Sequence, residues 1–276
     1  MSAEPIIVIE AGKSERKYWR DVWNYRELLY FLTWRDVLVR YKQTVIGVAW
    51  VILRPLLIML VFTIAFGKIA KLPSEGATPY PLLVLAGLLP WQFFATALSE
   101  ASASLVSNAN LVTKVYFPRI VVPVSATITS LVDFVVTLGL LVAAMAWYGV
   151  WPSARILAII PLLALMFTAA LGAGIWLAAL NVRYRDFRYI VPFIVQFGLY
   201  VSPVGFSSKV IPEGWAWIYM INPMVGVIDG FRWALLDTGA PLDLRPLAVS
   251  AASSLGLLWA GIAYFRRAER SLADVI

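Results

Sequence analysis

Six long apolar runs constrain this chain more strongly than any other feature of its sequence. They lie at residues 45–67, 82–106, 120–148, 156–180, 189–206 and 247–265. A helix of about 20 mainly apolar residues crosses the hydrocarbon core of a bilayer. Only 14% of the residues are charged, whereas soluble domains carry about 25%. The pattern predicts an all-α integral membrane protein with six transmembrane helices in one domain, residues 44–266.

The fifth run is the shortest, and two prolines, Pro192 and Pro203, interrupt it. A broken helix is tolerated in a bilayer only where protein covers it or where it lines a cavity. The segment that follows, residues 207–246, is long, rich in tryptophan and apolar, with a turn signal at Asn222-Pro223. We expect short external helices that re-enter the outer leaflet, although an interfacial aromatic belt alone would explain the same rings.

Lysine and arginine are concentrated on one side of the predicted membrane. Most of them lie in the segments 1–43, 107–119, 182–188 and 266–270, and the opposite side carries Lys68, Lys71, Arg155, Lys209, Arg232 and Arg245. Because loops rich in positive charge stay in the cytoplasm, both termini are predicted to be cytoplasmic, including the N-terminal segment 1–23 and the tail 267–276. The net charge of +7 follows from these loops, and we expect no nucleic-acid partner.

Residues 24–43 are predicted to form an amphipathic helix before the first span. The apolar face holds Leu28, Phe31, Leu32, Trp34, Leu38 and Val39, and the polar face holds Arg26, Thr33, Asp36 and Arg40. Such a helix is typical of a segment that lies in the membrane interface and contacts lipid. A soluble-type helix packed against a partner protein is the alternative.

The residue types that the sequence lacks exclude several kinds of chemistry. There is no cysteine and no histidine, which removes disulfides and thiolates together with the usual general base and the commonest metal ligand. The sequence also has no G-x-x-x-x-G-K-[ST] motif for cradling nucleotide phosphates. We therefore expect no catalytic residues, no metal site and no cofactor on this chain, so that any ATP binds to another polypeptide.

Three ordered motifs carry a family resemblance. The first is Arg40-Tyr41-Lys42-Gln43-Thr44 followed by Gly47, Trp50 and Pro55; the second is NANLVTKVYFPR from Asn108 to Arg119; the third places RD, SP, NP and FR in that order between Asn181 and Trp233. The resemblance covers about residues 24–266. The motifs resemble the membrane subunits of ABC-2-type exporters, and most closely the branch that exports O-antigen and teichoic-acid polysaccharides.

The resemblance implies a function for the whole chain. Two copies would form the channel in the bacterial inner membrane, and two separate ATP-binding subunits, which hold ATP and magnesium, would drive it. The substrate would be an undecaprenyl-pyrophosphate-linked polysaccharide that moves outward from the cytoplasm. In such exporters cytoplasmic loops of the membrane subunit form coupling helices that rest on the ATPase.

The resemblance also assigns roles to particular residues. It assigns ATPase coupling to the loop 107–119 with Asn108, Lys114, Tyr116, Phe117, Pro118 and Arg119, and to the loop 182–188 with Arg183, Arg185 and Asp186. It assigns capture of the lipid pyrophosphate to Arg40, Lys42 and Gln43. Anchoring of the cytoplasmic side by positive charge alone is the alternative for each basic residue.

Three ionisable residues, Arg54, Glu100 and Asp133, fall inside predicted spans. Each costs roughly 2.5–3.5 kcal/mol at a helix centre and therefore needs a partner or water. At a rise of about 1.5 Å per residue, Arg54 and Glu100 lie at similar heights on antiparallel helices. This predicts an intramembrane Arg54–Glu100 ion pair, whereas Asp133 has no obvious partner in the sequence.

Aromatic side chains within the spans are candidates for lining a sugar path, because their faces provide apolar platforms for pyranose rings. The candidates are Trp91, Phe93, Phe94, Tyr116, Trp176, Phe197 and Tyr200. For each of them, packing between helices or contact with lipid is the alternative.

Three other functions fit parts of the same pattern. An ABC-2 exporter of small hydrophobic drugs would share the fold, but the Arg40–Lys42 motif favours the glycan branch. A polytopic glycosyltransferase or polymerase would need carboxylates in an aqueous loop, where the sequence offers Glu213, Asp229, Asp237 and Asp243. A membrane scaffold without transport would leave the proline-interrupted fifth run unexplained.

Overall fold

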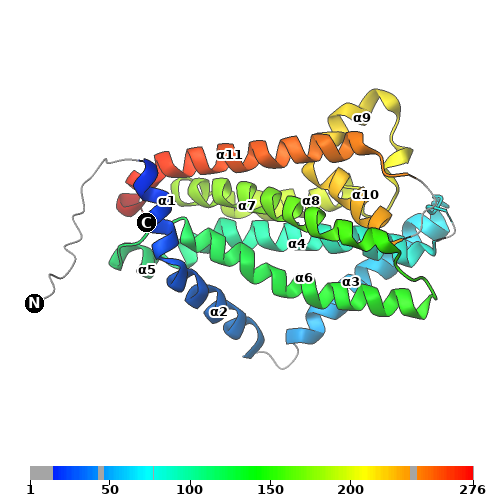
Figure 1. Ribbon diagram of the computed structural model, residues 1–276, viewed down its shortest axis with the longest axis horizontal. Coiled ribbons are helices and arrows are strands. Elements are labelled where there is room, and N and C mark those ends of the chain that lie inside the picture. Colours follow the sequence, from blue (N-terminus) through cyan, green and yellow to red (C-terminus); the bar gives the residue numbers. More distant parts are fainter. Residues whose placement is uncertain (1–14, 43–46, 77, 237–240, 276) are drawn as a thin grey trace, which may run out of the picture.

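The chain folds into a bundle of helices, in a computed structural model that describes residues 15–42, 47–76, 78–236 and 241–275 (Figure 1). Every regular element in these ranges is helical, and five stretches are long and apolar enough to cross a membrane. They are α3 (Gly47–Phe62) with its π-helical continuation η1 (Thr63–Ile69), α4 (Tyr80–Ser107), α6 (Val121–Trp147), α7 (Ile159–Arg183) preceded by η2 (Ala154–Ala158), and α11 (Leu244–Val275). The all-α prediction is confirmed for the described residues, and five predicted spans lie near their predicted positions.

The fifth predicted span is a shorter helix than the others. α8 (Phe187–Val201) has 15 residues, or about 22 Å at 1.5 Å per residue, which is less than the roughly 30 Å of a bilayer core. The helix ends here because Pro203 disfavours helical geometry in the residue before it, and Ser202 is extended, with φ −84° and ψ 153°. The count of six spans depends on α8 and stays a prediction.

The segment after α8, predicted to be external, folds into three short helices: η3 (Ser208–Val210), α9 (Glu213–Met220) and α10 (Pro223–Leu235). Asn222 caps α10 by accepting the Met224 N–H at 3.0 Å, and proline at the first helical position suits a helix start. α10 is almost wholly buried and packs against α4, α7 and α11. α9 instead lies at one end of the bundle (Figure 1), and its tryptophans are exposed. The predicted helices exist, and their insertion into the outer leaflet stays a prediction.

α4 is the central helix of the bundle. It contacts α3, α6, α7, α8 and α10, and 83% of its most apolar stretch is buried, compared with 11% in α3. Its rings Phe93 and Phe94 pack in the main core with Phe134 of α6 and Phe231 of α10. The helices around α4, and α3 above all, therefore form the surface that a membrane or a second copy would contact.

α7 and α11 pack closely because glycine replaces larger side chains where they meet. A Cβ atom added to Gly172 would collide with the Leu258 backbone, and one added to Gly261 would collide with the Gly172 carbonyl. Small residues allow such backbone contact between apolar helices, where lipid supplies no hydrophobic drive for association. This contact fixes the last long helix against the bundle.

Both described chain ends lie at the end of the bundle opposite α9, beside α5 (Ala109–Lys114) (Figure 1). Here Arg119 donates its backbone N–H to the Glu269 carboxylate at 2.8 Å and a guanidinium N–H to the Glu269 carbonyl at 2.6 Å. The Arg266 guanidinium lies 5.0 Å above the Tyr18 ring of α1 (Glu15–Asn24). The predicted tail 267–276 is thus a continuation of α11 as far as Val275, and all of α1 except its last residue, Asn24, falls within the predicted segment 1–23.

The predicted interfacial helix is present as α2 (Arg26–Lys42), but it leans along α6 instead of crossing the bundle end. Leu32 packs with Phe117 in a second apolar core at the α5 end of the bundle, whereas Arg40 reaches Asp133, roughly 18 Å beyond the start of α6 at 1.5 Å per residue. The exposed side of α2 carries Tyr30, Phe31, Trp34, Leu38 and Val39. Arg40 of the predicted polar face therefore meets the bundle, where its charge finds partners, whereas Arg26 of the same face stays exposed.

Candidate functional site

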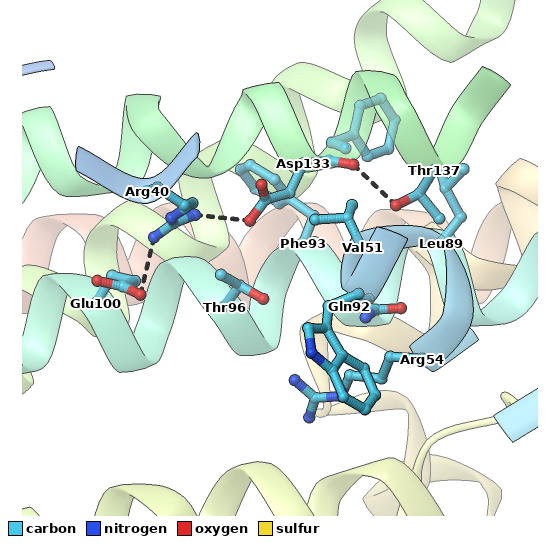
Figure 2. A pocket seen from close by; sticks show the side chains of 12 residues that line it. Arg40, Val51, Arg54, Leu89, Gln92, Phe93, Thr96, Glu100, Asp133 and Thr137 are labelled. Atoms are coloured by element: carbon cyan, nitrogen blue, oxygen red, sulfur yellow. Dashed lines mark hydrogen bonds and ion pairs between the residues drawn. The ribbon is translucent and has the colours of Figure 1, made fainter. Parts of the chain in front are cut away.

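A cluster of charged side chains joins α2 to the two helices behind it. Arg40 of α2 lies between Glu100 of α4, at 2.8 Å, and Asp133 of α6, at 2.6 Å (Figure 2). The Tyr41 hydroxyl also donates to Asp133. Carboxylates and guanidinium at this depth each need a partner, and here they supply one another. The cluster therefore fixes the C-terminal end of α2 against the bundle.

This geometry corrects two predictions about ionisable residues. The predicted Arg54–Glu100 pair is wrong, since Glu100 pairs with Arg40, and the Arg54 guanidinium lies apart from Glu100 with no interaction drawn between them (Figure 2). Asp133, which has no obvious partner in the sequence, pairs with Arg40 and Tyr41. Both differences have the same physical cause: α2 leans along α6 and thereby places Arg40 beside the two carboxylates.

The residues predicted to capture a lipid pyrophosphate differ in their surroundings. The guanidinium of Arg40 is engaged by two carboxylates, and Lys42 is exposed at the end of α2. Gln43 lies outside the described residues. An anion that approached Arg40 would have to compete with Glu100 and Asp133, so Lys42 is the more accessible cation of the two.

A small cavity adjoins the cluster between α2, α3, α4 and α6. Its volume is about 200 Å³. The polar lining consists of Arg40, Arg54, Gln92, Thr96, Glu100, Asp133 and Thr137, and the apolar lining of Trp50, Val51, Leu89, Phe93 and Phe134 (Figure 2). Charged, amide, hydroxyl and indole groups thus converge at one place on helices that are otherwise apolar.

A second polar cluster, at the opposite end of the bundle, surrounds Arg232 of α10, which is 1% exposed. Arg232 donates to three backbone carbonyls, those of Leu83 at 3.2 Å, Val204 at 2.9 Å and Phe206 at 2.9 Å. The Glu75 carboxylate lies 3.8 Å from the guanidinium. Because Val204 and Phe206 follow the end of α8, their carbonyls have no helical partners, and Arg232 supplies the missing donors.

The SP, NP and FR motifs meet in this second polar cluster. The Asn222 side chain donates to the Ser202 hydroxyl at 2.9 Å, and Ser202 itself is fully buried. Asp229 lies one turn before Arg232, and burial raises its pKa to about 6, while a hydrogen bond from Ser208 and the charge of Arg232 oppose that shift. Sequence reasoning singled out these motifs as family marks but missed that they are packed on one another.

The predicted coupling loops divide into exposed and internal residues. Exposed residues are Lys114, Tyr116, Arg183, Arg185 and Asp186. Phe117 is 4% exposed and belongs to the second apolar core, at the α5 end of the bundle, so its predicted contact with a partner is corrected to a packing role. Pro118 is half-buried, Arg119 binds Glu269, and Asn108 accepts from Arg35 of α2 at 2.8 Å.

The predicted channel aromatics divide in the same way. Trp91, Phe93 and Phe94 are 5%, 2% and 8% exposed, so they are core residues of a single chain rather than a lining between two copies. Trp176, Phe197, Tyr200 and Tyr116 are exposed, and their contact with sugar stays a prediction. On α8 the rings of Phe193 and Phe197 stack at 5.8 Å with 9° between their planes.

The bundle, with five long apolar helices and polar helices at one end, defines a multi-pass helical membrane protein. Residues 27–236 match the family described as ABC-2 type transporter, and the chain belongs to that family.

Several relatives match almost the whole chain. The O-antigen export system permease protein RfbA of Myxococcus xanthus is 32% identical over 259 residues, which cover 93% of this chain and 98% of the relative. An RfbA of Klebsiella pneumoniae with the same description is 29% identical over 91% of this chain and 95% of its own length. The polysialic acid transport protein KpsM of Escherichia coli is 23% identical over 86% of this chain and 92% of its own.

Proposed function

We propose that this chain is the membrane subunit of an ATP-driven exporter that moves a lipid-linked, O-antigen-like polysaccharide outward across the bacterial inner membrane. The observation that carries the proposal is the similarity along nearly the full length to relatives named as O-antigen export permeases. The lipid anchor would be undecaprenyl pyrophosphate. The chain would act as transporter and not as enzyme, with both termini in the cytoplasm.

Two copies of the chain would form the path, with two separate ATP-binding subunits beneath them. α3 supports this arrangement, because it exposes apolar residues along most of its length. α8 supports it too, because it exposes a strip of rings that includes Phe193, Phe197 and Tyr200. Aromatic faces of this kind let sugar rings slide without fixing their hydroxyl groups.

Deletion of the gene tests the proposed function. We expect loss of long-chain surface polysaccharide and accumulation of the lipid-linked polymer inside the cell, measured by glycan extraction from both compartments. An unchanged surface glycan with new drug sensitivity would instead indicate an exporter of small hydrophobic compounds. A polymer that is never synthesised would indicate a polytopic glycosyltransferase or polymerase.

Coupling to the ATPase is tested most sharply at two adjacent residues. Tyr116 is 66% exposed and Phe117 is 4% exposed. Tyr116→Ala is expected to uncouple ATP hydrolysis from export, because it removes an exposed side chain that would contact the ATPase. It is expected to leave thermal stability unchanged, because that side chain is not part of the core. Phe117→Ala is expected to cost about 3–5 kcal/mol of stability through a core cavity.

The measurements are ATP hydrolysis and glycan export by the reconstituted complex, with unfolding temperature as the control. Tyr116→Ala complexes that export at the wild-type rate per ATP hydrolysed would contradict the assignment of this loop to coupling.

A further inference from the structure

Arg54 is a cation at membrane depth without a partner in the described part of the chain. It lies about two turns into α3, roughly 10 Å along the axis from Gly47 at 1.5 Å per residue, and its side chain is exposed. Its guanidinium makes no ion pair or hydrogen bond with any described residue, and Figure 2 shows it apart from the cluster of Arg40, Glu100 and Asp133. Since an unpaired guanidinium in hydrocarbon costs roughly 2.5–3.5 kcal/mol, Arg54 needs water or a group from outside the described chain as its partner.

The cavity beside Arg54 contains a second unsatisfied group. The Gln92 side-chain oxygen is buried and accepts no hydrogen bond from any described residue, and a buried acceptor left unpaired costs about 1–3 kcal/mol. Trp50, which is 57% exposed, lines the same cavity. The cavity wall therefore offers one cation without an anion, one acceptor without a donor, and an indole ring.

These three features together restrict the ligand. A simple anion would satisfy Arg54 but would leave the Gln92 oxygen without a donor. A sugar phosphate satisfies both, because its phosphate oxygens accept from the guanidinium fork and its hydroxyls donate to the Gln92 oxygen. The face of its sugar ring suits the exposed indole of Trp50. The Arg40 charge is matched by two carboxylates, so Arg54 provides the uncompensated positive charge.

We propose that the cavity between α2, α3, α4 and α6 binds the phosphate and the first sugar of a lipid-linked glycan. Arg54 contacts the phosphate, and the Gln92 oxygen accepts from a sugar hydroxyl. α3 is the least buried of the long helices, so a prenyl tail can stay in the bilayer while its headgroup enters past Trp50. The proposal rests on the proposed function, to which it adds a defined headgroup site.

The test compares the binding of three lipids by native mass spectrometry of the chain with its ATP-binding subunit. The lipids are a polyprenyl diphosphate carrying one N-acetylglucosamine, the same polyprenyl diphosphate without sugar, and phosphatidylglycerol. Arg54→Gln is expected to weaken both polyprenyl diphosphates at least tenfold and to leave phosphatidylglycerol unchanged, with partial rescue by Arg54→Lys. The matched control is Lys68→Gln, which removes an exposed cation near the other end of the same apolar stretch and is expected to change no affinity.

Gln92→Leu provides an independent readout. It is expected to remove the preference for the sugar-bearing diphosphate while binding of the bare diphosphate is retained, and a preserved preference would overturn the sugar contact. Arg54→Gln with wild-type affinity for the diphosphates, or with an equal loss for phosphatidylglycerol, would overturn the phosphate contact.

The failure of this site is distinguishable from the failure of the proposed function. A wild-type complex that binds neither polyprenyl diphosphate, together with an unchanged surface glycan in the deletion strain, would refute both. If Arg54→Gln and Gln92→Leu both bind the lipids and export glycan as the wild type does, the cavity assignment alone is refuted.

Discussion

Arg232→Ala is expected to lower the stability of the folded chain by about 3–5 kcal/mol, the range for removing one member of a buried charged pair. The substitution leaves Glu75 without its cation, and it leaves the carbonyls of Val204 and Phe206, which follow the end of α8, without their hydrogen-bond donors. At about 2–4 °C per kcal/mol for a chain of this size, the unfolding temperature in detergent should fall by roughly 6–20 °C. Export should also be lost, because α10 loses the hydrogen bonds that join it to α4 and to the segment after α8.

Arg232→Lys separates charge from geometry in the same measurement. Lysine keeps the positive charge, but its single ammonium cannot replace three guanidinium nitrogens that bond to three different carbonyls. We therefore expect a loss close to that of alanine. The control is Arg245→Ala, an exposed residue at the start of α11, which should change stability by no more than about 0.5 kcal/mol. Wild-type stability in Arg232→Lys would show that charge alone matters.

Arg40→Gln is expected to release α2 from the bundle and to abolish export. Removal of the Arg40 guanidinium leaves Glu100 and Asp133 near each other at membrane depth without their cation. We expect a loss of about 2–3 kcal/mol, below the range for a fully buried pair, because the Glu100 side chain is 50% exposed and solvent screens it.

The docking of α2 can be followed directly because the chain has no cysteine. In a Leu32→Cys background, maleimide reacts with a position that is 2% exposed when α2 is docked. Arg40→Gln should accelerate labelling strongly, and Arg26→Gln, on an exposed part of the same helix, should not. The neutral triple variant Arg40→Gln, Glu100→Gln, Asp133→Asn should restore slow labelling, since no uncompensated charge remains. Fast labelling in the triple variant would mean that the ion pairs themselves, rather than the removal of unpaired charge, hold α2.

The sequence motifs located the polar clusters, but their roles had to come from the fold. Ser202, Asn222 and Arg232 were marks of a family in the sequence, and in the structure they meet where α8 ends and leaves carbonyls unpaired. Arg119 was assigned to coupling by resemblance, and its visible partner is Glu269 of the last helix. Both pairings join residues far apart in the chain, and no local pattern specifies such partners.

The sequence by itself determined the all-helical membrane architecture and the positions of five long helices, because hydropathy and helix-breaking prolines act on local stretches of chain. Only the tertiary structure decided which charges pair and which rings are core. The Arg54–Glu100 prediction assumed that only residues of the spans lie at membrane depth. In the structure α2 leans along α6, and its Arg40 pairs with Glu100 and Asp133. Ion pairs form between side chains that packing brings within a few ångströms, and packing is a property of the assembled bundle.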